Sequence, residues 1–173
     1  NPPYTRQEEM EYKQQIRDVA LTYTDGSEIA VDARAGIYAY FFTHSAKFLK
    51  NGGRMGYITS DTWLDVGYGE GLKSFLIGHF KILAILWYDV RAFERALVGT
   101  CISILEKEDA SEEARNENVV KFIRIKKPMP TEEIVKVIEK TDAEFEDEKV
   151  SAILMKQSDL QPRDKWGKYL RAP

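Results

Sequence analysis

KILAILWY at residues 81–88 and GTCISIL at residues 99–105 are two nearly continuous apolar runs, and together they decide the fold of this chain. A short apolar run bounded by loop residues is typical of a strand that is buried on both faces of a sheet. Residues 89–98 separate the two runs and show no helical pattern. The two strands are therefore predicted to pair with each other in the antiparallel direction.

The residues before these runs predict a helix, a strand and a second helix. Aromatic residues of 37–50 fall on one helical face, and Asn51-Gly52-Gly53 supplies a stop signal. Residues 54–60 are expected to form a strand, and residues 70–80 a helix. We interpret the glycine-containing segment 67–71 as a mobile loop, because a nucleotide-binding glycine turn should join a strand directly to a helix.

The resulting order over residues 37–105 is helix, strand, helix, strand, strand. This order is typical of the second half of a three-layer, mostly parallel α/β sheet in which one strand is reversed. A helix is also predicted over residues 6–23, a further strand over residues 119–125, and another helix after Pro130. The stretches 106–118 and 141–148 are acidic and are expected to lie in solvent.

The composition narrows the possible classes of function. The net charge of −3 over 173 residues argues against a generic nucleic-acid coat, so any DNA-facing surface must be local. Cys101 is the single cysteine, so no disulfide within the chain is possible, which fits a reducing cytoplasm. His44 and His79 are far apart in the sequence and lack the spacing of metal-binding motifs. We expect a buried strand position for Cys101, structural or surface positions for both histidines, and neither a metal site nor a membrane span.

The tetrapeptide Asn1-Pro2-Pro3-Tyr4 carries the chemical signal of the chain. A ring-conjugated amine is a weak nucleophile, and two acceptors that hold its N–H groups favour the tetrahedral geometry that attack requires. The Asn1 side-chain oxygen and the Pro2 carbonyl are the candidate acceptors, and the prolines restrict the backbone that carries them. Tyr4 is the candidate for stacking on a planar base. The same four residue types also occur in ordinary turns.

Several segments after the tetrapeptide strengthen this interpretation. Leu49-Lys50-Asn51-Gly52-Gly53 ends an aromatic helix, a strand follows at 54–59, and Trp63-Leu64 comes next. Residues 92–100 place Phe93 in the loop before a strand with small residues and a threonine. With these motifs, residues 1 to about 107 resemble the adenine-N6 DNA methyltransferases of restriction-modification systems, and within them the type IIG branch.

The resemblance implies a fold, a cofactor and a partner. It implies the second half of a Rossmann-like, S-adenosylmethionine-dependent methyltransferase sheet with one antiparallel strand, plus a small C-terminal appendage. The substrate implied is double-stranded DNA with a flipped adenine, held by Asn1, Pro2 and Tyr4 and contacted by Phe93. Residues that bind S-adenosylmethionine are expected upstream of Asn1, so the chain is expected to be a fragment that is inactive alone.

The resemblance also divides the chain into three parts. Residues 1–107 are expected to be a partial catalytic domain, 108–149 a strand-helix appendage with acidic linkers, and 150–173 the start of a connection to a target-recognition domain. A nuclease fused to the same polypeptide is possible in this branch. The recognised DNA sequence is not readable from these residues, since base readout depends on the recognition domain.

Other functions fit some of the same features. A protein-glutamine N-methyltransferase faces the same planar nitrogen and shares the Asn-Pro-Pro-Tyr motif, and a cytosine-N4 enzyme is chemically close but more often begins the motif with serine. A non-catalytic interaction module fits the acidic stretches. From the residues alone, Phe93 could equally be a loop anchor in the core. Lys121, Arg124, Lys126 and Lys127 form a small basic cluster that we interpret as a solvated face.

Overall fold

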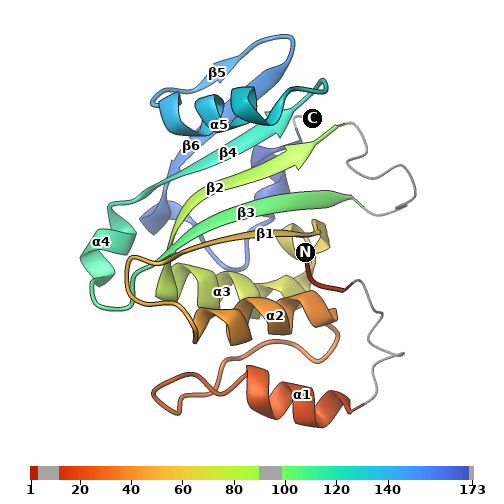
Figure 1. The fold of residues 1–173 in the computed structure, drawn as a ribbon, viewed down its shortest axis with the longest axis vertical. Coiled ribbons are helices and arrows are strands. Elements are labelled where there is room, and N and C mark those ends of the chain that lie inside the picture. Colours follow the sequence, from red (N-terminus) through yellow and green to blue (C-terminus); the bar gives the residue numbers. More distant parts are fainter. Residues whose placement is uncertain (4–11, 90–98, 172–173) are drawn as a thin grey trace.

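A computed structural model describes residues 1–3, 12–89 and 99–171 of this chain (Figure 1). The helices are α1 (Lys13–Ala20), α2 (Ile37–Ala46), α3 (Glu70–His79), α4 (Glu112–Asn116) and α5 (Thr131–Lys140). The strands are β1 (Arg54–Ser60), β2 (Phe80–Tyr88), β3 (Thr100–Lys107), β4 (Val119–Ile125), β5 (Phe145–Glu146) and β6 (Val150–Lys156). Short 3-10 helices lie at Thr62–Leu64, Gly67–Gly69, Gln157–Asp159 and Trp166–Tyr169. The predicted order of elements over residues 37–105 is confirmed.

The strands form one sheet in the order β1-β3-β2-β4-β6-β5. β3 lies between β1 and β2 and is antiparallel to both, which confirms the antiparallel pairing predicted from the two apolar runs. β2 and β4 pair in parallel. The chain therefore has a mixed α/β sheet in which β3 is the predicted reversed strand.

Residues after Lys107 continue this sheet. β4 pairs with β2, and β6 then pairs with β4 in the antiparallel direction, which makes β6 a second reversed strand. The strand at 119–125 and the helix after Pro130 are confirmed, and the acidic stretches also hold the short elements α4 and β5. The division of the chain at 107 and 149 stays a prediction, since a shared sheet does not define a domain boundary.

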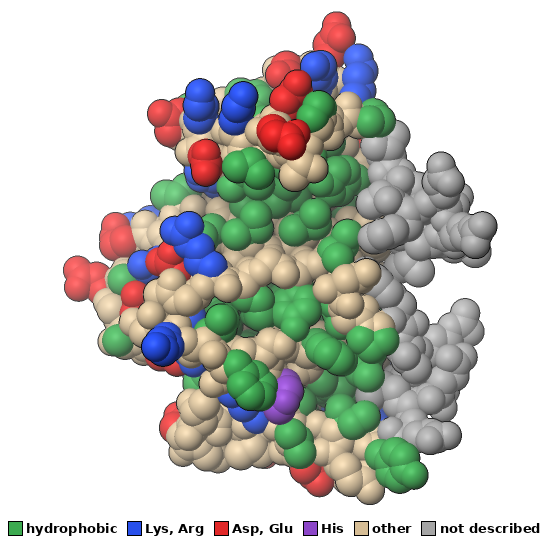
Figure 2. Space-filling view, in the orientation of Figure 1, with side chains coloured by type: hydrophobic (Ala, Val, Ile, Leu, Met, Phe, Trp, Pro, Cys, Tyr) green, Lys and Arg blue, Asp and Glu red, His purple; other side chains and the backbone are tan. Residues whose placement is uncertain are grey.

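Helices cover both faces of the sheet, which gives the three layers. One face packs on α2 and α3 in a core that includes Phe42, Leu76 and Phe122. The other face carries Ala84 and Leu86 and is covered by α5. On this second face Ile102 and Ile104 of β3 stay half-buried, and Figure 2 shows hydrophobic side chains gathered below the charged surface at the top of the view.

The helix predicted over residues 37–50 ends earlier, at Ala46. The physical reason is Lys107, a buried residue at the end of β3 whose ammonium group donates to the carbonyl oxygens of Ala46 (2.9 Å) and Leu49 (3.0 Å). These bonds take up carbonyl groups that a helix end leaves unpaired. A contact between residues about 60 positions apart thus sets the end of α2.

Glycines 69 and 71 provide close packing, whereas the sequence led us to expect a mobile loop. A Cβ atom at Gly69 would lie 2.0 Å from the Trp63 carbonyl oxygen, and one at Gly71 would lie 1.7 Å from the Ala30 carbonyl oxygen. Each glycine is therefore needed where two backbone segments touch. The segment is ordered into a 3-10 turn and the start of α3.

Two glycines of α3 should respond oppositely to the same substitution. We expect Gly71→Ala to lower the free energy of unfolding by about 1–3 kcal/mol, because the added methyl group overlaps the Ala30 backbone. Gly78→Ala meets no atom within 4 Å and should stabilise the helix by up to about 1 kcal/mol. Urea titration of the two variants measures this, and equal effects of both would contradict the packing role.

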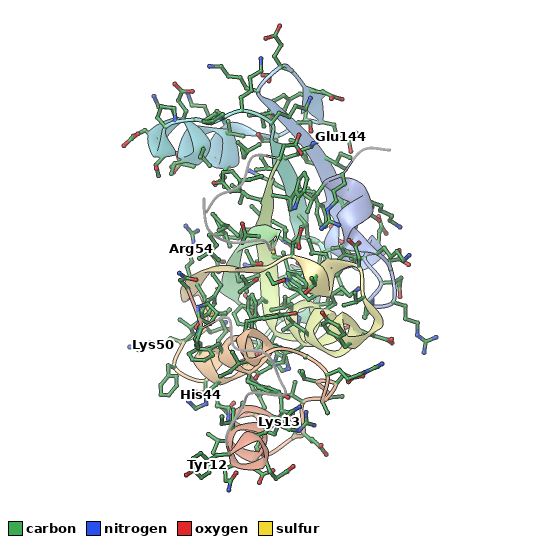
Figure 3. All side chains as sticks on the ribbon, turned by 90° about the vertical axis from the view of Figure 1, so that its right-hand side faces the viewer. Tyr12, Lys13, His44, Lys50, Arg54 and Glu144 are labelled. Atoms are coloured by element: carbon green, nitrogen blue, oxygen red, sulfur yellow. The ribbon has the colours of Figure 1, made fainter. Side chains whose placement is uncertain are left out.

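A polar cluster ties the segment after α1 to the residues at and just after the end of β3. The Tyr23 hydroxyl donates to the Asp109 carboxylate at 2.9 Å, and His79 Nδ1 lies 2.8 Å from the same carboxylate. Lys107 Nζ lies 3.3 Å from it. His79 is thus a structural residue, as predicted, while His44 lies half-buried on α2, where Figure 3 labels it apart from Arg54 and Glu144.

We expect the chain to lose stability as the pH falls below about 4. Burial opposes ionisation of Asp109, but the hydrogen bonds from His79 and Tyr23 and the charge of Lys107 outweigh it and lower the pKa of this carboxyl group. A carboxyl whose pKa is lower in the folded state contributes stability above its unfolded pKa, and this contribution disappears as the pH falls through the folded value. As the pH is lowered below about 4, the melting temperature should fall less steeply for Asp109→Asn than for the wild type. Parallel curves would contradict the role of Asp109.

Candidate functional site

The carboxyl end of the sheet is the place where functional side chains of an α/β fold gather. β1 ends at Ser60 and β2 ends at Tyr88 on this side of the molecule. Figure 1 shows the N-terminal tripeptide at the same end of the sheet. Pro2 is buried there, whereas Asn1 and Pro3 are exposed. Two of the predicted site residues, Asn1 and Pro2, therefore lie at the end of the sheet where β1 and β2 end.

The two predicted aromatic contacts cannot be compared with the structure. Tyr4 and Phe93 lie outside the described residues, which end at residue 3, resume at 12, and have a second gap between 89 and 99. Their assignment to the substrate base stays a prediction. The described residues on either side of the second gap, Asp89 and Gly99, are placed at the carboxyl end of the sheet by the end of β2 and the start of β3.

Asp61 is the residue that sequence reasoning missed at this end. It follows β1 directly and is 7% exposed. Its Oδ2 atom accepts a hydrogen bond from Trp87 Nε1 at 2.8 Å and from Arg171 Nη2 at 2.7 Å. Its backbone N–H donates to the Gly99 carbonyl oxygen at 3.0 Å. A polar residue directly after a buried strand was the available signal, but its partners lie 26 and 110 positions away.

Two arginines hold the Trp87 ring at the end of β2. The guanidinium carbon of Arg171 lies 5.3 Å from the ring centroid, and that of Arg124 lies 5.9 Å from it. Arg124 is itself paired with Asp89 at 2.9 Å. Cation–π contacts of this kind fix the orientation of an aromatic ring.

A second carboxylate anchors the C-terminal segment. Asp65 Oδ2 pairs with Arg171 Nη1 at 2.6 Å, and Asp65 Oδ1 accepts from the Gly167 backbone N–H at 3.0 Å. Within the described part of the chain, Asp65 makes its side-chain hydrogen bonds to Gly167 and Arg171 and none to β2 or Gly99. It thus secures residues 167–171 to the segment after β1, while Asp61 contacts the strand ends as well.

Hydroxyl groups line the segment between β1 and α3. Thr62 Oγ1 accepts a hydrogen bond from the Tyr68 hydroxyl at 3.1 Å and lies 3.0 Å from Ser60 Oγ. The Tyr38 hydroxyl lies 3.4 Å from the same oxygen, and burial raises the pKa of Tyr38 above its ordinary value. These hydroxyl groups form a hydrogen-bonded cluster around Thr62.

Cys101 has the buried strand position predicted for it, whereas the basic cluster is not simply the solvated face that was predicted: Lys121, Arg124 and Lys126 are half-buried, and Lys127 is exposed. Cys101 is fully buried in β3, and burial raises its pKa to about 12, so the thiol stays protonated. Arg124, Lys126 and Lys127 are paired with Asp89, Glu146 and Glu148, respectively. Lys121 donates to the Ile138 carbonyl oxygen. These four cations are engaged within the chain.

The described part of the chain shows no cluster of side chains that would hold a metal ion. Its glycine-containing segment does not form a nucleotide cradle either, because protein backbone fills the space beside Gly69 and Gly71. No described residue is therefore assigned to S-adenosylmethionine. Within the same residues, no helix has both the length and the apolarity that a membrane crossing requires.

The fold is that of restriction-modification methyltransferases. The type IIG restriction endonuclease BpuSI superposes with a TM-score of 0.71 at 16% identity, over 96% of this chain and 20% of that one. The type I methyltransferase subunit from Streptococcus thermophilus superposes with a TM-score of 0.55 at 18% identity, over 72% of this chain and 27% of that one. This likeness confirms the predicted class, a partial Rossmann-like methyltransferase sheet.

The sequence comparisons identify the family. Residues 1–93, more than half of the chain, match the Eco57I restriction-modification methylase family, and the chain belongs to this family. The type II methyltransferase M.BstVI of Geobacillus stearothermophilus is 33% identical over 86 residues, which cover 50% of this chain and 14% of that protein. M.XhoI of Xanthomonas vasicola is 28% identical over 117 residues, or 66% of this chain and 20% of that protein. The chain thus spans a fifth or less of these relatives.

Proposed function

We propose that the protein containing this chain transfers a methyl group from S-adenosylmethionine to N6 of adenine in double-stranded DNA, as part of a restriction-modification system. The observation that carries the proposal is the position of Asn1 and Pro2 at the carboxyl end of the sheet, with Pro2 buried. Membership of the Eco57I methylase family supports the reaction type. The leading Asn1 favours adenine over cytosine N4.

Asn1 and Pro2 would act on the amine of the substrate. The Asn1 side-chain oxygen and the Pro2 carbonyl oxygen accept the two N–H groups of N6, which turns the nitrogen lone pair away from the ring. When bound, S-adenosylmethionine would supply the electrophilic methyl group, whose bond to sulfur would break as the bond to N6 forms, so that S-adenosylhomocysteine would leave. The extra proton on N6 leaves to solvent, so no strong general base is required.

Tyr4 and Phe93 are proposed to hold the adenine ring after it leaves the duplex. Stacking of an aromatic side chain on a base contributes about 1–3 kcal/mol, which offsets part of the cost of unstacking the base. The fold likeness to DrdV, whose structure was determined in complex with DNA, supports DNA as the partner (TM-score 0.52, 15% identity, over 97% of this chain and 18% of that one).

The setting of the proposed reaction follows from its substrate. Cellular DNA as substrate supports a cytoplasmic location for the protein. The likeness to BpuSI, a restriction endonuclease, supports a nuclease in the same polypeptide. A target-recognition domain in that polypeptide is part of the same proposal. The 173-residue chain by itself is proposed to be inactive; the packing of protein backbone against Gly69 and Gly71 supports this, because it leaves that glycine-containing segment no room to cradle the methyl donor.

Identification of the methylated product tests the proposal. The full-length protein is incubated with duplex DNA and methyl-labelled S-adenosylmethionine, and the digested DNA is separated into nucleosides. We expect label in N6-methyladenine. Label in N4-methylcytosine would show that cytosine is the target base. Label in a glutamine of an added protein would show that the substrate is a protein, and the absence of any labelled product would favour an interaction module.

A further inference from the structure

A groove between α1 and α2 opens to the surface of the described structure. It has a volume of about 430 Å³, and its walls are mainly apolar and aromatic: Ile16, Val19, Ala20, Ile37, Tyr40 and Phe41. Val19 is 58% exposed and Phe41 is 37% exposed. Figure 2 shows hydrophobic side chains gathered around a histidine in the lower half of the view. An exposed apolar patch of this kind marks a surface that contacts another part of a protein.

Helix α1 depends on a cover over this groove for its stability. It has eight residues, and a helix of that length is marginal in water unless its apolar face is packed. The structure describes α1 in full, and Ala20 is its buried residue. Ile16 is half-buried, and Val19 is exposed. The apolar face of α1 is therefore only partly packed by the described residues.

His44 adds an unsatisfied polar atom to the wall of the groove. Its Nδ1 atom is buried and has no hydrogen-bond partner among the described residues. The imidazole ring packs edge-on against the ring of Phe48, with 5.2 Å between the centroids, and Phe48 is itself 76% exposed. Buried polar atoms in folded proteins nearly always have a hydrogen-bond partner. A cover that brings a hydrogen-bonding group to His44 would satisfy this atom and bury Phe48.

We infer that a segment of the full-length polypeptide outside these 173 residues packs into the groove, with apolar side chains against Val19 and Phe41 and a hydrogen-bonding group at His44 Nδ1. This chain covers 14% and 20% of its two curated relatives, so most of such a polypeptide lies elsewhere. Nucleic acid does not fit, because the described lining of the groove contains no Lys or Arg. A permanent cover from the same polypeptide fits best, since α1 needs it whenever the chain is folded.

Hydroxyl-radical footprinting of the full-length protein tests this inference with a matched pair of residues. Phe41 in the groove and Phe145 on β5 are each 37% exposed in the described structure. A covered groove should lower the labelling of Phe41 to about one fifth of that of Phe145 or less, because a buried side chain has little contact with solvent. This protection should persist over a roughly 100-fold dilution, since a contact within one polypeptide does not depend on concentration. Equal labelling of the two residues would overturn the inference, and protection lost on dilution would overturn it in favour of a second copy.

Val19→Lys gives a second measurement in the full-length protein. Lysine is a better helix former than valine and suits the last turn of a helix, so the change is harmless in an open groove. In a covered groove the buried charge should expel the segment and raise the labelling of Phe41 to within about twofold of that of Phe145. Val135→Lys, at a 44% exposed position of α5, is the control and should leave Phe41 protected.

Unchanged labelling of Phe41 in a folded Val19→Lys variant would contradict the inference. If this variant does not fold, the comparison of Phe41 with Phe145 in the wild type still decides. The inference does not rest on the proposed function: a full-length protein that methylates no adenine would refute that function and leave the labelling results as they are.

Discussion

Asn1→Ala is expected to lower adenine methylation by the full-length protein about 100- to 1,000-fold, the effect of removing one preorganised hydrogen-bonding group at a reacting centre. The alanine removes the side-chain oxygen that would accept an N6 hydrogen, and it leaves the Pro2 carbonyl as the remaining acceptor. Loss of transition-state stabilisation should reduce kcat and leave the KM for DNA nearly unchanged. Initial rates of label transfer at saturating DNA and methyl donor measure the effect.

Two variants make this result specific. Asn1→Ser keeps a short oxygen acceptor and should retain more activity than Asn1→Ala. Asn51→Ala removes an asparagine amide from the loop before β1, where it contacts Glu108 and the Asp109 backbone N–H, and should leave kcat unchanged. Full activity of Asn1→Ala would remove Asn1 from the active site.

Gln157→Ala should reduce the free energy of unfolding of this chain by about 3–5 kcal/mol, because each buried polar group left unpaired costs about 1–3 kcal/mol. Gln157 is fully buried behind β2. Its amide donates to the Phe80 carbonyl oxygen at 2.7 Å, and its side-chain oxygen accepts from the Ile82 backbone N–H at 3.0 Å and from Asn118 at 2.9 Å.

The Gln157 contacts satisfy backbone groups at the start of β2. The pairing of β2 with β4 begins at Ala84, so Phe80 and Ile82 lie outside the paired segment on that side of β2. The Gln157 side chain takes the place of the missing ladder bonds. Urea titration of Gln157→Ala beside Gln161→Ala, whose residue is exposed, isolates the effect of the buried amide. A loss below about 1 kcal/mol for Gln157→Ala would mean that water replaces its contacts.

The sequence by itself determined the local elements and their order. The apolar runs at 81–88 and 99–105 predicted two buried strands, and the lack of a helical pattern in the residues between them predicted their antiparallel pairing. The strand at 54–60 and the strand at 119–125 were predicted with the bounds that β1 and β4 have. The tetrapeptide at Asn1 indicated the reaction type, since the residue types suit one chemical task.

Only the tertiary structure decided how distant residues meet. The end of α2 depends on Lys107, the glycines of 67–71 serve close packing, and β4 and β6 join the sheet after Lys107. The contacts of Asp61 with Trp87 and Arg171 join residues 26 and 110 positions apart. Periodicity and turn signals report interactions within a few residues of each other. Strand register and helix packing bring such distant groups together, and no local pattern in the sequence encodes them.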